Sequence, residues 1–203
     1  MPSRAADPLP AIEPALGLLE LETVPAGIAA GDAMAKRAPI ELIRAGTVHP
    51  GRFLVLVAGT VADVEEALEA GRESGGLAVR DVVFLPHIHG DVVAGVRGRR
   101  LAAGTEALGV IETATIPAII RAADAGVKGA QVRLLELRLA DDLGGKGYLL
   151  FDGAVSEVEA AVELGRAAVG EARGLSARVI AQLHAEMAEN LAADARFAVR
   201  VGA

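Results

Sequence analysis

The apolar positions of the first half fall into short runs that are separated by longer stretches with helical character. Each run has the length and the aliphatic composition of a strand. A helix is expected from Pro25 to about Lys36, because proline is tolerated in the first turn, and another opens after Gly59 with acids in its first turn. The four expected strands span residues 15–22, about 40–48, 53–58 and 79–85.

The second half repeats this succession. Its helices are expected from Pro117 to about Lys128 and after Gly153. Its expected strands span residues 107–113, about 132–139, 148–151 and about 177–183. Both halves therefore have the order βαββαβ, which is the split-βαβ arrangement of ferredoxin-like folds. We predict an α+β protein with two four-stranded antiparallel sheets, each carrying its helices on one side.

Direct sequence identity supports a duplication. ALGLLELETVPAGIAAGDAMAK (15–36) aligns without a gap on ALGVIETATIPAIIRAADAGVK (107–128), with 12 of 22 positions identical. A second matching block follows at an offset that is two residues longer. The period exceeds that of solenoid repeats, so each copy is a small domain. The predicted organisation is a flexible N-terminal tail (1–12), a first domain (13–97), a linker (98–105) and a second domain (106–203).

Composition narrows the possible functions. The chain has no cysteine, which excludes thiolate chemistry and cysteine-bound metal centres and is consistent with a reducing compartment. Aromatic residues make up 2% and the net charge is −7, so we expect no nucleic-acid partner. No apolar run is long enough to cross a membrane. The serines and histidines form no nucleophile–base pattern, so we expect no enzymatic activity. His87 and His89 are spaced like metal ligands, but turn histidines in solvent are favoured, and we expect no metal or cofactor.

The repeated motifs resemble a known family. A-L-G-[LV]-[LI]-E, then T-x-P, then D-A-x-x-K is similar to the opening of bacterial microcompartment (BMC) shell domains. The apolar third strand followed by x-V-x-x-V-E-x-A is similar to their later part. Because both copies carry both blocks, the chain resembles the tandem-domain class (BMC-T) over residues 14–192. That class forms trimers that imitate a hexagon of six domains, with a central pore for small metabolites.

The resemblance implies a structural shell protein in the bacterial cytoplasm, which assembles with hexameric and pentameric tiles into a protein sheet. It places the loops between the second and third strands at the pore. These loops contain His49, Pro50, Gly51, Arg52, Asp141, Asp142, Leu143, Gly144, Gly145 and Lys146. From sequence alone, ordinary glycine-containing strand connections are the more economical interpretation.

Two further expectations concern charge. We hypothesise that Arg52, Lys146 and the glycine amides attract small anions to the pore. The resemblance also places Lys36 and Lys128 at the edge of the tile, where His87 replaces an arginine that many shell domains have.

The alternative function is a regulatory protein that binds small metabolites between ferredoxin-like units.

Overall fold

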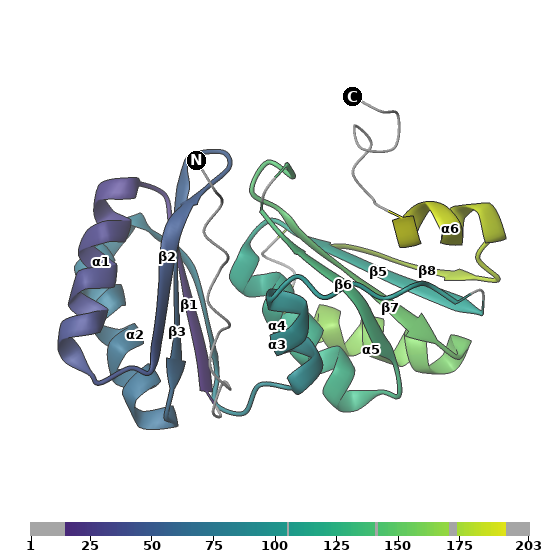
Figure 1. Cartoon of the computed structure of the whole chain (residues 1–203), viewed down its shortest axis with the longest axis horizontal. Helices are drawn as coiled ribbons and strands as arrows, with labels where there is room; N and C mark the ends of the chain where they lie inside the picture. The colour runs from purple at the N-terminus through teal and green to yellow at the C-terminus, as the bar shows by residue number, and fades with distance from the viewer. Residues whose placement is uncertain (1–14, 105, 141, 171–173, 194–203) are drawn as a thin grey trace, which may run out of the picture.

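Each half of the chain folds into one antiparallel four-stranded sheet with two long helices, as a computed structural model shows (Figure 1). The structure describes residues 15–104, 106–140, 142–170 and 174–193. The first repeat contains β1 (Ala15–Leu21), α1 (Val24–Arg37), β2 (Leu42–Val48), β3 (Arg52–Gly59), α2 (Val61–Gly75), the 3₁₀ turn η1 (Gly76–Ala78), β4 (Val79–Leu85) and α3 (Gly90–Val96). The second contains β5 (Ala107–Thr113), α4 (Ile116–Gly129), β6 (Arg133–Leu139), β7 (Gly147–Gly153), α5 (Val155–Val169), β8 (Ser176–Ala181) and α6 (Ala185–Ala193).

The two sheets have the same topology. Their strand orders are β2-β3-β1-β4 and β6-β7-β5-β8, and all neighbours are antiparallel. Corresponding residues occupy corresponding positions. Glu20 on β1 lies opposite Asp81, and Glu112 on β5 lies opposite Ser176. The α+β prediction of two tandem ferredoxin-like domains is confirmed, and the shared register allows residue-by-residue comparison of the repeats.

The long helices of each repeat cover one face of their own sheet. Gly17 and Gly109 make this possible on the central strands, because a methyl group there would come within 2.8 Å of Leu68 on α2 and of Val158 on α5, respectively. The absence of a side chain therefore lets each helix approach its sheet closely. None of the described helices is both long and apolar enough to cross a membrane.

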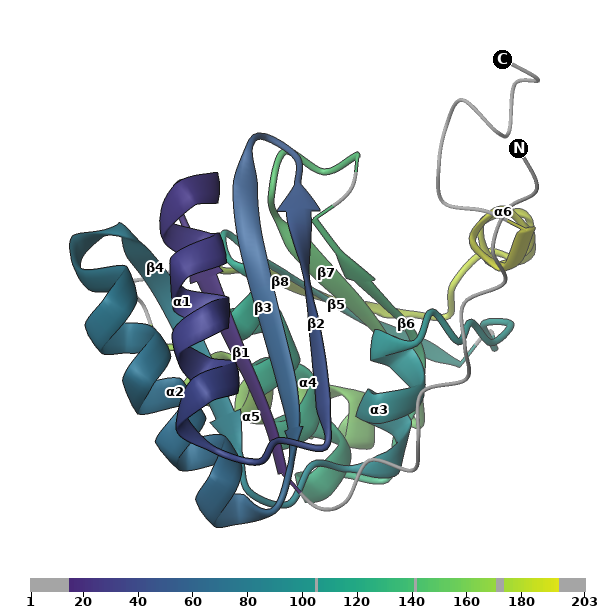
Figure 2. The same ribbon diagram turned by 60° about the vertical axis from the view of Figure 1, so that its left-hand side comes forward.

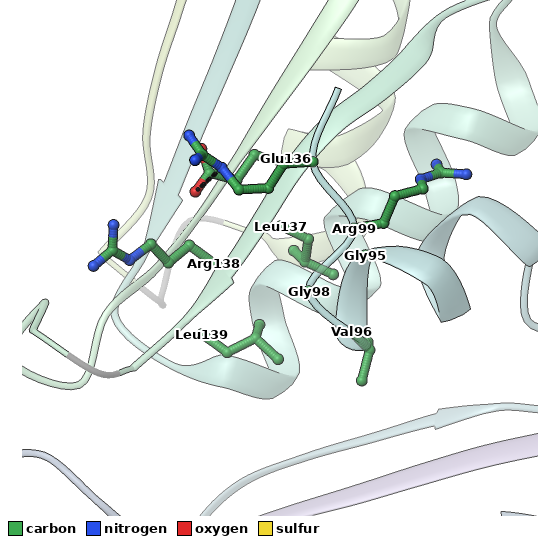
Figure 3. A pocket seen from close by; sticks show the side chains of 9 residues that line it. Gly95, Val96, Gly98, Arg99, Glu136, Leu137, Arg138 and Leu139 are labelled. Atoms are coloured by element: carbon green, nitrogen blue, oxygen red, sulfur yellow. Dashed lines mark hydrogen bonds and ion pairs between the residues drawn. The ribbon is translucent and has the colours of Figure 1, made fainter. Parts of the chain in front are cut away.

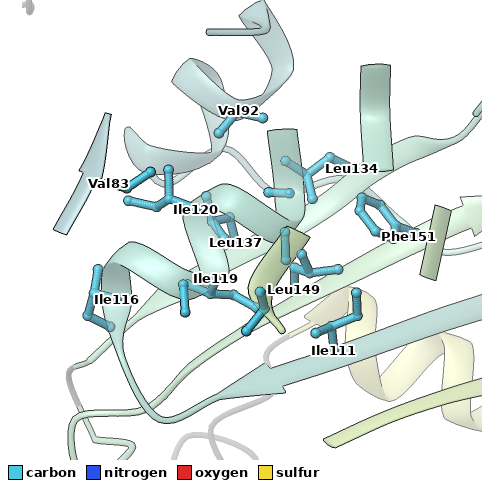
Figure 4. Packing of buried hydrophobic residues seen from close by; sticks show 14 of the residues in the cluster. Val83, Val92, Ile111, Ile116, Ile119, Ile120, Leu134, Leu137, Leu149 and Phe151 are labelled. Atoms are coloured by element: carbon cyan, nitrogen blue, oxygen red, sulfur yellow. The ribbon is translucent and has the colours of Figure 1, made fainter. Parts of the chain in front are cut away.

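The other face of the first sheet is covered by the second repeat. Helix α4 lies between the two sheets in Figure 1, so the layers run from α1 and α2 through the first sheet, α4 with α5, and the second sheet. Leu18 and Val83 from the first sheet share one buried cluster with Ile116 and Ile120 of α4. Figure 4 shows Val83 beside these two isoleucines. The two repeats therefore share a continuous hydrophobic core.

Two short helices were not predicted from the sequence. Helix α3 packs against β6 of the second repeat, with Val92 fully buried near Leu134 (Figure 4). Helix α6 packs through Ala188 against Leu108 and Leu150 on the outer face of the second sheet, opposite α4 and α5 (Figure 2). Both are too short for a clear helical period in the sequence, because tertiary contacts provide most of their stability.

Candidate functional site

The junction between the repeats has a buried carboxylate at its centre. Glu20 extends from β1 toward α4 and is fully buried. One of its oxygens accepts a hydrogen bond of 2.8 Å from the backbone N–H of Ile116, the first residue of α4. The other lies 3.1 Å from Nη1 of Arg52 and 3.3 Å from Nε of Arg80. A strand of the first repeat thus holds the amino end of a helix of the second.

Electrostatics favour this arrangement in two ways. The first N–H groups of a helix have no acceptor within the helix and form its positive end, so a carboxylate there is stabilising. Burial raises the pKa of Glu20, and the Ile116 N–H and the two guanidinium groups oppose that rise. Arg80 also bonds to Glu22 at 2.5 Å, and this hydrogen bond lowers the pKa of Glu22.

Further polar contacts cross the junction along α4. The hydroxyl of Thr115 donates to a carboxylate oxygen of Asp81 at 2.5 Å. Arg121 donates from Nη2 to the carbonyl oxygen of Val82 at 2.6 Å. These residues are unremarkable in the sequence. They become recognisable as contacts only once α4 is known to lie on the first sheet.

The predicted edge residues have different environments. Lys128 bonds to Asp124 at 2.5 Å and to the backbone carbonyl of His87. The two predicted edge residues Lys128 and His87 are therefore in contact within one chain. Asp124 also accepts from the N–H of His89 at 2.8 Å. Lys36 is exposed and pairs only with Asp32, at 2.6 Å, among the residues that the structure describes.

The two predicted pore loops lie side by side although they are far apart in the sequence. Arg52 Nη1 lies 3.3 Å from the carbonyl oxygen of Gly145, and a methyl group on Gly145 would come within 2.9 Å of Pro50. Gly51, Gly144 and Gly145 have φ of 98°, 61° and 80°, a left-handed conformation that favours glycine.

The remaining loop residues are mostly exposed. His49, Asp142 and Gly144 are exposed and Leu143 is half-buried, while Asp141 lies outside the described residues. The basic side chains are already paired, since Arg52 bonds to Glu20 and Lys146 bonds to Glu112 at 2.9 Å. The hypothesis that Arg52 attracts anions therefore requires it to leave an intact ion pair.

A pocket between α3 and β6 has basic side chains in its lining, but their charges do not converge on one point. Its volume is about 260 Å³. Arg99 and Arg138 line it but point away from each other (Figure 3), and Arg100 pairs with Glu136 at 3.3 Å. In the described part of the chain, no group of three or more histidine or carboxylate side chains is placed to hold a metal ion.

Comparisons with known proteins agree with this architecture. The BMC domain model matches residues 15–88 and 107–183. The chain is 37% identical to the bacterial microcompartment shell protein PduT of Citrobacter freundii over 77% of this chain and 85% of that protein. It is 29% identical to the carboxysome assembly protein CcmO of Synechocystis sp., over 85% of this chain and 60% of that protein.

A solved structure has a similar fold over most of the chain. A crystal structure of a microcompartment protein from Desulfitobacterium hafniense superposes with a TM-score of 0.73 at 35% identity, covering 86% of this chain and 98% of that one. The two domain matches together span most of the sequence and coincide with the two folded repeats. The chain therefore belongs to the BMC-domain family and carries two BMC domains in tandem.

Proposed function

We propose that this chain is a structural shell protein of a microcompartment in the bacterial cytoplasm. Three copies close into a ring of six BMC domains, and the two kinds of loop surround a pore for small metabolites. The protein has no catalytic activity of its own. The names of its relatives, which are shell and carboxysome assembly proteins, support the shell role.

The main support for the ring is a contact that occurs once within the chain, between the outer face of the first sheet and the first helix of the second repeat. Both repeats contain such a sheet face and such a helix. The outer face of the first sheet is covered by α4. On the equivalent face of the second sheet, α6 covers the area around Leu108 and Leu150, but within the described ranges no helix in the place of α4 packs there. Ile120 of α4 is 0% exposed in the junction, and its equivalent on α1, Ile28, is 58% exposed. We propose that helix α1 of a second copy packs on the part of this face that α6 does not cover.

Two more pairs show the same contrast. Leu85 is 9% exposed, and Ile180, which holds the same register position on β8, is 41% exposed. Val92, the third residue of α3, is 0% exposed, and Met187, the third residue of α6, is 51% exposed. An interface in which one face meets a different face repeats head to tail, and it gives a closed ring when the rotation between neighbours closes.

The pore follows from the same repetition. Within one chain the loop after β2 contacts the loop after β6. If each junction copies the internal one, all six loops meet at one axis, and their glycines keep side-chain bulk low there. Arg52 and Lys146 lie at the base of these loops. Because each is already in an ion pair, its charge attracts a passing anion less strongly.

The tile edge is proposed to include Lys36. Its side chain is 74% exposed, against 42% for that of Lys128, which already bonds across the internal junction. We expect Lys36→Ala to retain the ring and to lose sheet formation with itself or with hexameric and pentameric shell partners. Electron microscopy of purified protein distinguishes these outcomes, and a variant that forms sheets as wild type would contradict the edge role.

Cross-linking tests the ring directly, because the chain has no cysteine of its own. His49→Cys places a thiol in the first loop, and Ser74→Cys is the matched control at the far end of α2. A trifunctional maleimide is expected to give covalent dimers and trimers only with the first variant. A monomer by sedimentation, or cross-linking from Ser74 alone, would contradict the proposal. A regulatory protein would instead show ligand-dependent melting without a ring.

A further inference from the structure

We infer that Glu112 of one copy caps the amino end of α1 of the next copy, and that this contact is the main polar interaction that stabilises the interface between chains. The inference rests on the proposed ring and assigns residues to its intermolecular junction. Its template is the internal contact in which Glu20 accepts from the N–H of Ile116 at 2.8 Å.

The residues on both sides have direct equivalents. Glu112 holds the position of Glu20 on the central strand, at the offset of 92 residues that relates the repeats. Its partner is Lys146, 2.9 Å away, which stands where the first repeat has Arg52. The Glu112 side chain is 39% exposed, against 1% for Glu20. Glu112 and Lys146 therefore form the same ion pair on the outer face of the second sheet that Glu20 and Arg52 form on the first sheet. Only the pair in the first repeat has a helix end bound to it.

The complementary helix end is the start of α1. Val24 begins α1 as Ile116 begins α4, and both follow an extended threonine. The side chain of Thr23 makes no capping hydrogen bond, and among the described residues the Val24 N–H has no acceptor. A carboxylate from another chain would stabilise this helix start, because it would accept a hydrogen bond from an N–H group that has no capping side chain.

The intermolecular junction keeps only part of the internal ion network. Arg80, Glu22 and Asp81 correspond to Leu175, Ala114 and Ser176 by register and offset. In addition, Val83, which packs with Ile120, corresponds to Arg178. Of the charged groups that surround Glu20, only the equivalent of Arg52 remains near Glu112. Loss of the Glu112 carboxylate is therefore not compensated by neighbouring charges.

Subunit exchange provides the test. Trimers labelled on Ser74→Cys with donor or acceptor dyes are mixed, and energy transfer reports exchange of whole chains. A hydrogen bond to a charged group contributes roughly a factor of ten or more to each junction. A departing chain breaks two junctions, so Glu112→Ala is expected to exchange about 100-fold faster than wild type. The matched control is Glu163→Ala, which removes an exposed carboxylate from α5.

A second variant removes the other half of the same contact. Val24→Pro deletes the N–H and suits both the first helical position and the extended residue before it. We expect it to accelerate exchange as Glu112→Ala does, and the double variant to exchange no faster than the faster single variant, because both remove one hydrogen bond.

The outcomes separate the two proposals. A wild-type chain that is monomeric at all concentrations would refute the ring. A wild-type trimer in which Glu112→Ala exchanges at the control rate, or in which the two substitutions act as independent factors, would leave the ring intact and overturn the assignment of Glu112. Circular dichroism of each variant establishes that the fold is retained.

Discussion

Substitution of Glu20 by alanine is the sharpest perturbation of the internal junction. The carboxylate is fully buried, accepts hydrogen bonds from a helix N–H and from Arg52, and forms an ion pair with Arg80. Its removal leaves the N–H of Ile116 and the guanidinium groups of Arg52 and Arg80 without their shared acceptor. The expected result is a large loss of stability without a change of fold.

The magnitude follows from the partners that remain. Removing one member of a buried ion pair costs about 3–5 kcal/mol, because the other member stays buried without a partner. Arg80 keeps its 2.5 Å contact with Glu22, and Arg52 keeps the carbonyl oxygen of Gly145. We therefore expect the lower end, about 3 kcal/mol. Glu20→Gln retains an acceptor for the helix N–H and is expected to cost about 1–2 kcal/mol.

The assay is urea unfolding followed by circular dichroism, since the chain has no tryptophan and one tyrosine. Wild type and variants are compared at one protein concentration, and equal slopes show that the same surface unfolds. Glu163→Ala, which removes an exposed carboxylate, is expected to stay within about 0.5 kcal/mol of wild type. A cost for Glu20→Ala below about 1 kcal/mol, the range of exposed ion pairs, would refute the reasoning.

Three other predictions follow from the same junction. Ile120→Ala is expected to lower the free energy of unfolding in urea by about 2–5 kcal/mol, because Ile120 is buried in the junction. Ile28→Ala is expected to lower it by less than about 1 kcal/mol in the monomer at high dilution. Equal losses would contradict the assignment of Ile120 to the buried side. Because the pKa of Glu22 is lowered on folding, its contribution is present above its ordinary pKa of 4.5 and is lost as the pH falls below it. The stability difference between wild type and Glu22→Gln should therefore shrink during an acid titration, and growth of that difference would have the wrong sign. Lys128→Met leaves the buried Asp124 with one partner fewer and is expected to cost about 1–3 kcal/mol by thermal or urea unfolding, whereas no change would show that the ammonium group is dispensable.

The sequence was informative wherever the hydrophobic pattern was strong. The strand runs and the proline-marked helix starts predicted the βαββαβ order in both repeats, and the helices begin one residue before Pro25 and Pro117. These elements are long and aliphatic, so local pattern and tertiary packing agree. Helices α3 and α6 were missed because each is short and depends on the surface on which it packs.

The candidate site shows what a pattern cannot distinguish. Glu20 and Glu112 are identical in type and register, yet one is buried and the other half-exposed. Likewise, Lys128 is held by the first repeat while Lys36 faces solvent. The difference comes from which sheet face meets which helix, and that is a property of domain packing. No single-repeat sequence pattern contains that information.

The most direct test of the central claim is a cryo-electron microscopy reconstruction of the purified assembly. The account predicts a ring of three chains of 20.7 kDa, with the loops at residues 49–52 and 142–146 around the axis and α1 of each chain seated on the second sheet of its neighbour. A reconstruction in which these loops lie at the outer perimeter, or particles that contain a single chain, would contradict it.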